Sequence, residues 1–136
     1  MRRKLTLTAI LASIIIAGQT AQAEQVKLNG YQQAKKIIYA TFPKSTENSA
    51  LRIAGCETGH TYSQWATGKA GEKGYFQIHP SNNRRSLYWK GNFVGRIMFS
   101  RLYNPWYNSK VALYMSEGGK DWHEWWICSG KLGLRR

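Results

Sequence analysis

The chain has 136 residues and a formal net charge of +13, with 20 Lys and Arg against seven Asp and Glu. This length suits one domain and leaves no room for a second of ordinary size. The excess of cations makes an anionic polymer or surface the expected partner, although a basic surface kept for solubility is an equally common alternative.

The first 23 residues have the pattern of a secretory signal peptide. Residues 1–4 are basic, residues 5–17 are mostly apolar, and Ala21-Gln22-Ala23 forms an A-x-A cleavage site. The apolar run is short for a membrane span. We therefore predict a signal peptide at 1–23 and one domain at 24–136. The mature protein is expected to be a secreted or periplasmic monomer without stable membrane insertion.

The two cysteines, Cys56 and Cys128, both lie in the predicted mature chain. An exported protein with one matched pair usually oxidises it, so a disulfide is expected. It would close a loop of roughly 70 residues and contribute about 4 kcal/mol in the chain-entropy model. A catalytic Cys–His pair is the alternative.

Hydrophobic periodicity predicts a mainly α (α+β) fold. Helical stripes run through residues 31–42, 45–57, 93–102 and 105–115, with Ser45 expected to cap the second helix. Gly-rich residues 59–80 predict loop and a small β-hairpin, in which residues 75–78 most resemble a strand. That strand would place Tyr75 and Gln77 on one face, toward a groove.

Glu57 ends the apolar face of the second predicted helix, and Gly59 can stop that helix directly afterwards. The carboxyl would then point toward the interior or a cleft. Burial raises a carboxyl pKa, and a raised pKa is what a general acid for glycoside cleavage needs at neutral pH. The open alternative is a helix-terminal Glu that only meets solvent.

Other chemistries have weaker support in the sequence. His60, His79 and His123 lack metal-ligand spacing, so no metal is expected. There is no nucleophile elbow, no phosphate-binding loop and no nucleic-acid-binding motif, so neither a cofactor nor a nucleic-acid partner is expected. The six Trp and eight Tyr could stack on sugar rings, or they could simply fill the core of a small domain.

Four motifs occur in an order that resembles the lysozyme-like superfamily of lytic transglycosylases and goose-type lysozymes. They are C-E-T-G at residues 56–59, G-Y-F-Q-I-H-P at 74–80, N-P-W-Y-N at 104–108 and W-x-x-W-W-I-C at 122–128. The nearest resemblance is to small exported resuscitation-promoting-factor-like and phage lysozyme-like domains. It covers about residues 50–128 and implies a helical domain whose small hairpin flanks a glycan groove.

The resemblance also implies roles for individual residues. Glu57 matches the catalytic general acid of the superfamily. Gln77 matches the glutamine that lines the sugar groove, and Tyr75 would lie in the groove wall. Asn108 and Tyr114 match the Asn and Tyr of the helix beside the catalytic acid, so we expect them to help hold the glycan.

The implied activity is cleavage of the β-1,4 bond between N-acetylmuramic acid and N-acetylglucosamine in peptidoglycan glycan strands. Glu72, in the Gly-rich segment, is a possible second acid for a lysozyme or else a solvated loop charge. Without a second acid, Glu57 would act as acid and then as base, giving the 1,6-anhydro sugar of a lytic transglycosylase. A non-catalytic wall-glycan-binding module is the main alternative.

Overall fold

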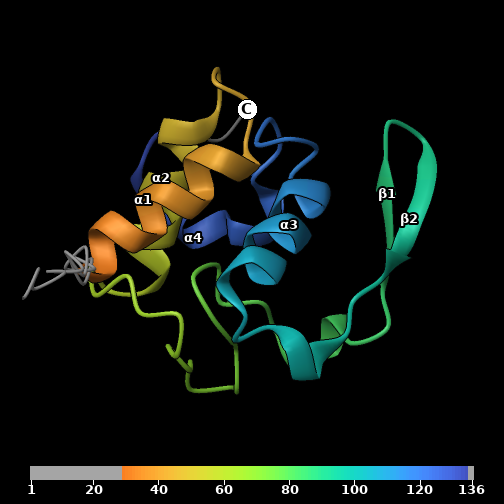
Figure 1. The fold of residues 1–136 in the computed structure, drawn as a ribbon, viewed down its shortest axis with the longest axis horizontal. Coiled ribbons are helices and arrows are strands. Elements are labelled where there is room, and N and C mark those ends of the chain that lie inside the picture. The colour runs from red at the N-terminus through yellow and green to blue at the C-terminus, as the bar shows by residue number, and fades with distance from the viewer. Residues whose placement is uncertain (1–28, 135–136) are drawn as a thin grey trace, which may run out of the picture.

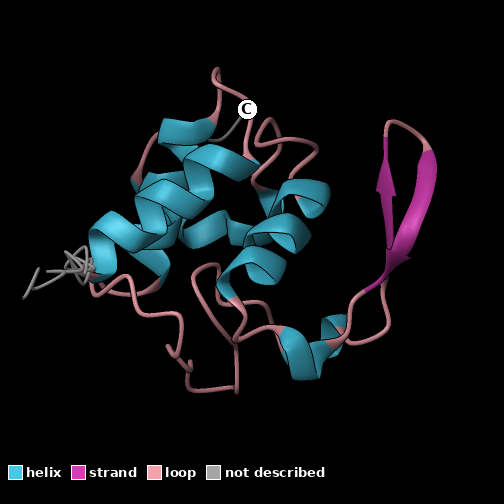
Figure 2. Cartoon of the chain, viewed as in Figure 1, coloured by secondary structure: helices cyan, strands magenta, loops and turns pink. Residues whose placement is uncertain are grey.

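A computed structural model describes residues 29–134, so the predicted signal peptide at 1–23 lies outside the described residues. The described part has four α-helices, three short 3-10 helices and one two-stranded antiparallel sheet (Figures 1 and 2). The prediction of a helical domain with one small hairpin is therefore confirmed. None of the described helices is both long and apolar enough to cross a membrane.

The two N-terminal helices follow the predicted periodicity. Helix α1 (Gly30–Thr41) begins with a capping box between Asn29 and Gln32. Helix α2 (Glu47–Glu57) buries its apolar face against α1. The predicted cap at Ser45 is wrong by one residue, because the N-cap is Thr46, whose side chain makes no capping hydrogen bond.

Helix α3 (Pro105–Met115) starts as its sequence predicts. Asn104 is the N-cap and accepts a hydrogen bond from the Tyr107 N–H, and Pro105 occupies the first turn, where its missing N–H costs nothing. The chain then turns through η3 (His123–Trp125) into α4 (Trp126–Lys131). Cys128 of α4 is bonded to Cys56 of α2, which confirms the predicted disulfide.

The hairpin occupies a different place from the one predicted. Strands β1 (Ser86–Trp89) and β2 (Asn92–Arg96) form it, followed by the 3-10 helix η2 (Phe99–Arg101), so the predicted helix at 93–102 is wrong. Residues 59–79 instead form a loop with two isolated β-bridges, Thr67 with Lys73 and Lys73 with Ile78. The predicted strand at 75–78 is a turn, because Gln77 has a left-handed φ of 44°.

An aromatic cluster ties this loop to the C-terminal segment. The Phe76 ring lies 5.7 Å from Phe42 and 6.2 Å from Trp122, centroid to centroid. Trp125 packs edge-on against Phe76 and donates its indole N–H to the Phe76 carbonyl at 2.6 Å. Because a buried indole N–H needs a partner, this bond fixes the loop directly beside Gln77.

Asn108 is a second fixed point of the loop and not a glycan ligand. Its fully buried side chain accepts from the Phe76 N–H at 3.0 Å and donates to the Lys73 and Leu102 carbonyls at 2.9 and 3.0 Å. All three partners are backbone groups of loops. The expectation that Asn108 holds a sugar is therefore corrected, because its amide is already occupied inside the core.

Replacing Asn108 by Ala is expected to lower the free energy of unfolding by roughly 3 kcal/mol. The substitution would leave buried backbone groups, such as the Phe76 N–H and the Leu102 carbonyl, without their hydrogen-bond partner. Chemical denaturation measures the change. Exposed Asn92→Ala is the matched control and should change stability by less than about 0.5 kcal/mol. A loss below about 1 kcal/mol in Asn108→Ala would contradict this structural role.

Candidate active site

The C-terminal end of α2 holds Glu57 in a defined position. Gly59 adopts a φ of 57°, and the His60 N–H bonds to the Gly55 carbonyl at 2.7 Å while the Gly59 N–H bonds to the Cys56 carbonyl at 3.3 Å. This is a Schellman motif, which confirms that Gly59 stops the helix. The disulfide at the preceding residue, Cys56, fixes the same turn to α4.

Glu57 lines a cleft of about 550 Å³, which we call the Glu57 cleft. Its walls come from α2, from the loop at 68–82, from the end of α3 and from the segment at 124–127. Among residues 29–134, the Glu57 carboxyl has no hydrogen-bond partner.

Burial raises the pKa of Glu57 to about 7, and the negative charge of Glu72 adds to the rise, while Lys131 opposes it. Desolvation is the largest cause, because it disfavours the ionised form. A carboxyl with this pKa is substantially protonated at neutral pH and can also lose its proton there. It can therefore serve as either an acid or a base.

Glu72 and Gln77 lie close together beside Gly68, and both line the same cleft as Glu57. A Cβ atom added to Gly68 would collide with Glu72 Oε2 and lie 2.9 Å from Gln77 Oε1, so glycine at this position allows both side chains this approach. The Gln77 amide nitrogen donates to the Ala66 and Gly74 carbonyls, and Glu72 accepts from the Ala70 N–H. The sequence analysis expected Gln77 to face a groove and gave Glu72 as a possible second acid.

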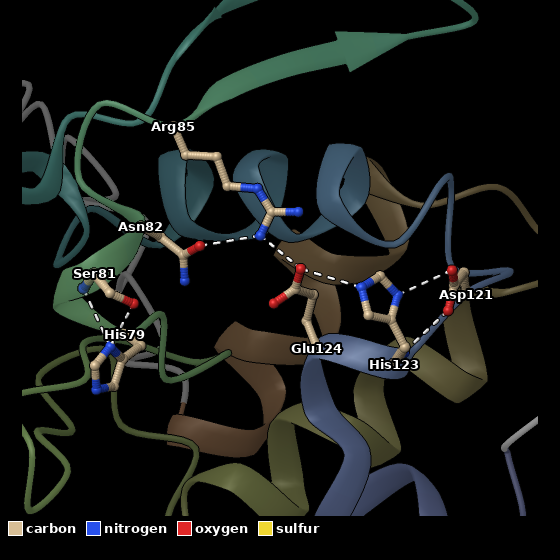
Figure 3. A network of polar contacts seen from close by, with 7 residues as sticks. All are labelled: His79, Ser81, Asn82, Arg85, Asp121, His123 and Glu124. Carbon is tan, nitrogen blue, oxygen red and sulfur yellow. Dashed lines mark hydrogen bonds and ion pairs between the residues drawn. The ribbon is translucent and has the colours of Figure 1, made fainter.

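A polar network (Figure 3) meets the Glu57 cleft at Asn82 and Glu124, which both line it. Glu124 lies at its centre, 2.6 Å from Arg85 Nη1 and 3.2 Å from His123 Nε2. Arg85 also donates to Asn82, and Asp121 lies 3.0 Å from His123 Nδ1. The hydrogen bond to Asp121 is the main reason why the pKa of His123 is raised.

The sequence analysis did not predict this network. The 3-10 helix η3 has no side-chain cap, and Glu124 forms an ion pair with Arg85. Arg85 and Glu124 are 39 residues apart, so no local spacing signals their contact. The exposed Trp126 and Ile127 also line this cleft and were likewise not predicted as site residues.

Tyr75 and Tyr114 do not line the Glu57 cleft, contrary to the expectation that they contact glycan. Tyr75 is only 1% exposed, and its burial raises its pKa to about 12. The tight turn at Gln77 breaks the strand alternation that would have placed both side chains on one face. Tyr114 faces the hairpin, where its ring lies 5.8 Å from that of Trp89.

Comparison of the chain with protein-family models, with curated proteins and with solved structures finds no significant match.

Proposed function

We propose that the protein cleaves the β-1,4 bond between N-acetylmuramic acid and N-acetylglucosamine in peptidoglycan. One observation carries the proposal: Glu57, with a pKa raised to about 7, lies in an open cleft beside a second carboxylate. Protonation of a glycosidic oxygen at neutral pH requires such an acid. The motif resemblance and the net charge of +13, which suits an anionic wall, support the same substrate.

In the proposed reaction, protonated Glu57 donates its proton to the bridging oxygen as the bond to the anomeric carbon breaks. The resulting Glu57 carboxylate then acts as a base. If it deprotonates the C6 hydroxyl of the muramic residue, that oxygen closes on the anomeric carbon and gives a 1,6-anhydro end. If it activates a water molecule instead, the product carries a reducing end.

The role of Glu72 distinguishes the two reactions. A lysozyme reaction has a use for a second carboxylate across the bond, and Glu72 is the acidic residue whose charge acts on Glu57. The transglycosylase reaction needs Glu72 only for its electrostatic effect. We favour the transglycosylase, because Glu72 is already held by the Ala70 N–H and by contact with Gly68.

The test is digestion of purified peptidoglycan followed by mass spectrometry of the soluble fragments. Fragments with 1,6-anhydro ends are expected, and fragments with reducing ends would instead make the protein a lysozyme with Glu72 as second acid. Binding to peptidoglycan with no fragment released would overturn the enzyme proposal and leave a non-catalytic glycan-binding module.

The electrostatic coupling in the cleft can be tested without substrate. Glu72→Gln is expected to lower the pKa of Glu57, and Lys131→Gln to raise it, because each removes one of the two charges that act on this carboxyl. Glu72→Gln should not restore the ordinary value, since burial is the larger cause. Carbon-13 NMR titration of the Glu57 carboxyl measures both shifts.

Glu124→Gln is the matched control for this titration. It removes a carboxylate from the same cleft, but Glu124 does not contribute to the shift of Glu57. A Glu57 pKa that moves as much in Glu124→Gln as in Glu72→Gln would contradict the assigned coupling.

A further inference from the structure

The β1–β2 hairpin stands to one side of the helices (Figure 1). Its two-residue loop, Lys90-Gly91, has φ angles of 49° and 79°. On the inner face, Trp89 packs on Tyr114 and reaches Gly118 near the end of α3. The attachment leaves the other face of the hairpin open to solvent.

That outer face carries large apolar side chains. Tyr88 and Phe93 are paired across the strands, with ring centroids 6.0 Å apart, and are 56% and 58% exposed. Val94, beside the irregularity in the strand register, is 43% exposed, and Met98 beyond β2 is 52% exposed. Contiguous exposed apolar groups on a small domain mark an interaction surface.

The same part of the chain is rich in cations, and the acidic residue that lies beside it is Glu117, which lines a pocket together with Trp89 and Lys90. Residues 73–116 contain seven Lys and Arg and no Asp or Glu. Of these seven, only Arg85 forms a salt bridge with a residue of the described part. Arg84, Lys90 and Arg96 flank the exposed rings of the hairpin and are themselves exposed.

From this combination we infer that the outer face of the β1–β2 hairpin binds the surface of an anionic phospholipid bilayer. Cations are drawn to the negative surface potential of such a bilayer, and apolar side chains enter the boundary between headgroups and acyl chains. A wall polyanion would satisfy the cations but has no apolar phase for Val94 and Met98. The binding is reversible adsorption, since a short hairpin does not span a membrane.

This inference is independent of the proposed peptidoglycan cleavage. No residue of β1, β2 or their loop lines the Glu57 cleft. Membrane binding by the hairpin therefore uses residues other than those that line the cleft.

Sedimentation with lipid vesicles tests the inference. The vesicles contain phosphatidylcholine with 30% phosphatidylglycerol, or phosphatidylcholine alone, and the protein is recovered after export so that every variant has the same N-terminus, checked by mass spectrometry. We expect binding to the anionic vesicles that weakens with salt. The variant Lys90→Gln/Arg96→Gln should lower the partition coefficient about thirtyfold, at about fivefold for each cation.

The apolar part is tested with Tyr88→Ser/Phe93→Ser, for which we expect at least a roughly tenfold loss. Lys35→Gln/Lys36→Gln removes the same charge from exposed positions of α1, and Trp65→Ser removes an exposed ring elsewhere. Both controls should bind within about threefold of the unmodified protein. Circular dichroism confirms that each variant is folded, and hydrogen exchange should show protection of residues 86–96 on the vesicles.

Three results would overturn the inference. Equal losses in the hairpin and α1 charge variants would show attraction by net charge alone. Unchanged binding of Tyr88→Ser/Phe93→Ser would show a purely electrostatic partner such as a wall polyanion. Binding without protection of residues 86–96 would place the contact elsewhere on the chain.

Discussion

Replacing Glu57 by Gln is expected to reduce the rate of peptidoglycan cleavage by about 10²–10⁴-fold, the usual contribution of a positioned general acid or base. The amide has nearly the same shape as the protonated carboxyl but cannot donate a proton to the glycosidic oxygen. Binding to peptidoglycan should be retained, since the walls of the cleft are unchanged. Rates come from the release of soluble fragments, and binding from sedimentation with insoluble wall.

Glu117→Gln is the matched control for this variant. Glu117 is exposed and lies outside the Glu57 cleft, so its replacement should leave the rate within about twofold. If Glu57→Gln cleaved peptidoglycan at the unmodified rate, Glu57 could not be the proton donor.

Glu57→Gln should also make the protein more stable at alkaline pH. Because the folded-state pKa of Glu57 is raised from 4.5 to about 7, folding favours the protonated form. The contribution of Glu57 to the free energy of unfolding is fully present below pH 4.5 and is lost as the pH rises through 7. At pH 8 the variant should gain up to about 3 kcal/mol, less to the extent that solvent screens the partly exposed carboxyl. Denaturation at pH 4 and pH 8 measures the difference.

Replacing both Cys56 and Cys128 by Ser is expected to lower the free energy of unfolding by about 4 kcal/mol, because the disulfide spans 72 residues. For a domain of this size, the loss corresponds to a fall in melting temperature of roughly 15–25 °C. Activity should also fall while the variant is still folded, since Glu57 directly follows Cys56 in the turn that the bond fixes. Thermal denaturation and cleavage rates measure the two effects.

Reduced, unmodified protein is the control for the disulfide variant. It should melt at nearly the same temperature as Cys56→Ser/Cys128→Ser, because both lack the same cross-link. A double variant that melts within about 3 °C of the oxidised protein would contradict the stabilising role of the bond.

The sequence predicted the helices well where local chemistry determines them. Asn104-Pro105 fixes the start of α3, and Gly59 fixes the end of α2 just after Glu57. The disulfide followed from the compartment that the predicted signal peptide implied. These features depend on neighbouring residues or on a single cysteine pair, so no knowledge of the tertiary structure was needed.

The hairpin was missed because its apolar residues also fit a helical stripe. Phe93, Val94 and Met98 have the spacing of a buried helix face, yet all three are exposed in the structure. The true turn signal was Lys90-Gly91, in which Lys adopts the left-handed conformation that sequence reasoning expects of Asn or Gly. These three side chains lie on the exterior while Ile97 and Leu102 of the same segment are buried, a division that periodicity cannot reveal.

The composition of the site could be predicted only in part. Glu57, Glu72 and Gln77 reach the cleft, because their positions follow from the end of α2 and from the Gly-rich loop. Asn108 and Tyr75 were assigned to the groove by resemblance, whereas the structure uses them inside the core. The Arg85–Glu124 contact depends on how distant segments pack, so it could be found only in three dimensions.

The rate of peptidoglycan cleavage as a function of pH reports both the proposed reaction and the group that carries it. We expect release of soluble fragments at a rate that falls as the pH rises through about 7, the pKa of Glu57. Release of no fragments at any pH would contradict the proposed activity. A rate that already falls near pH 4.5 would contradict the raised pKa of the catalytic acid.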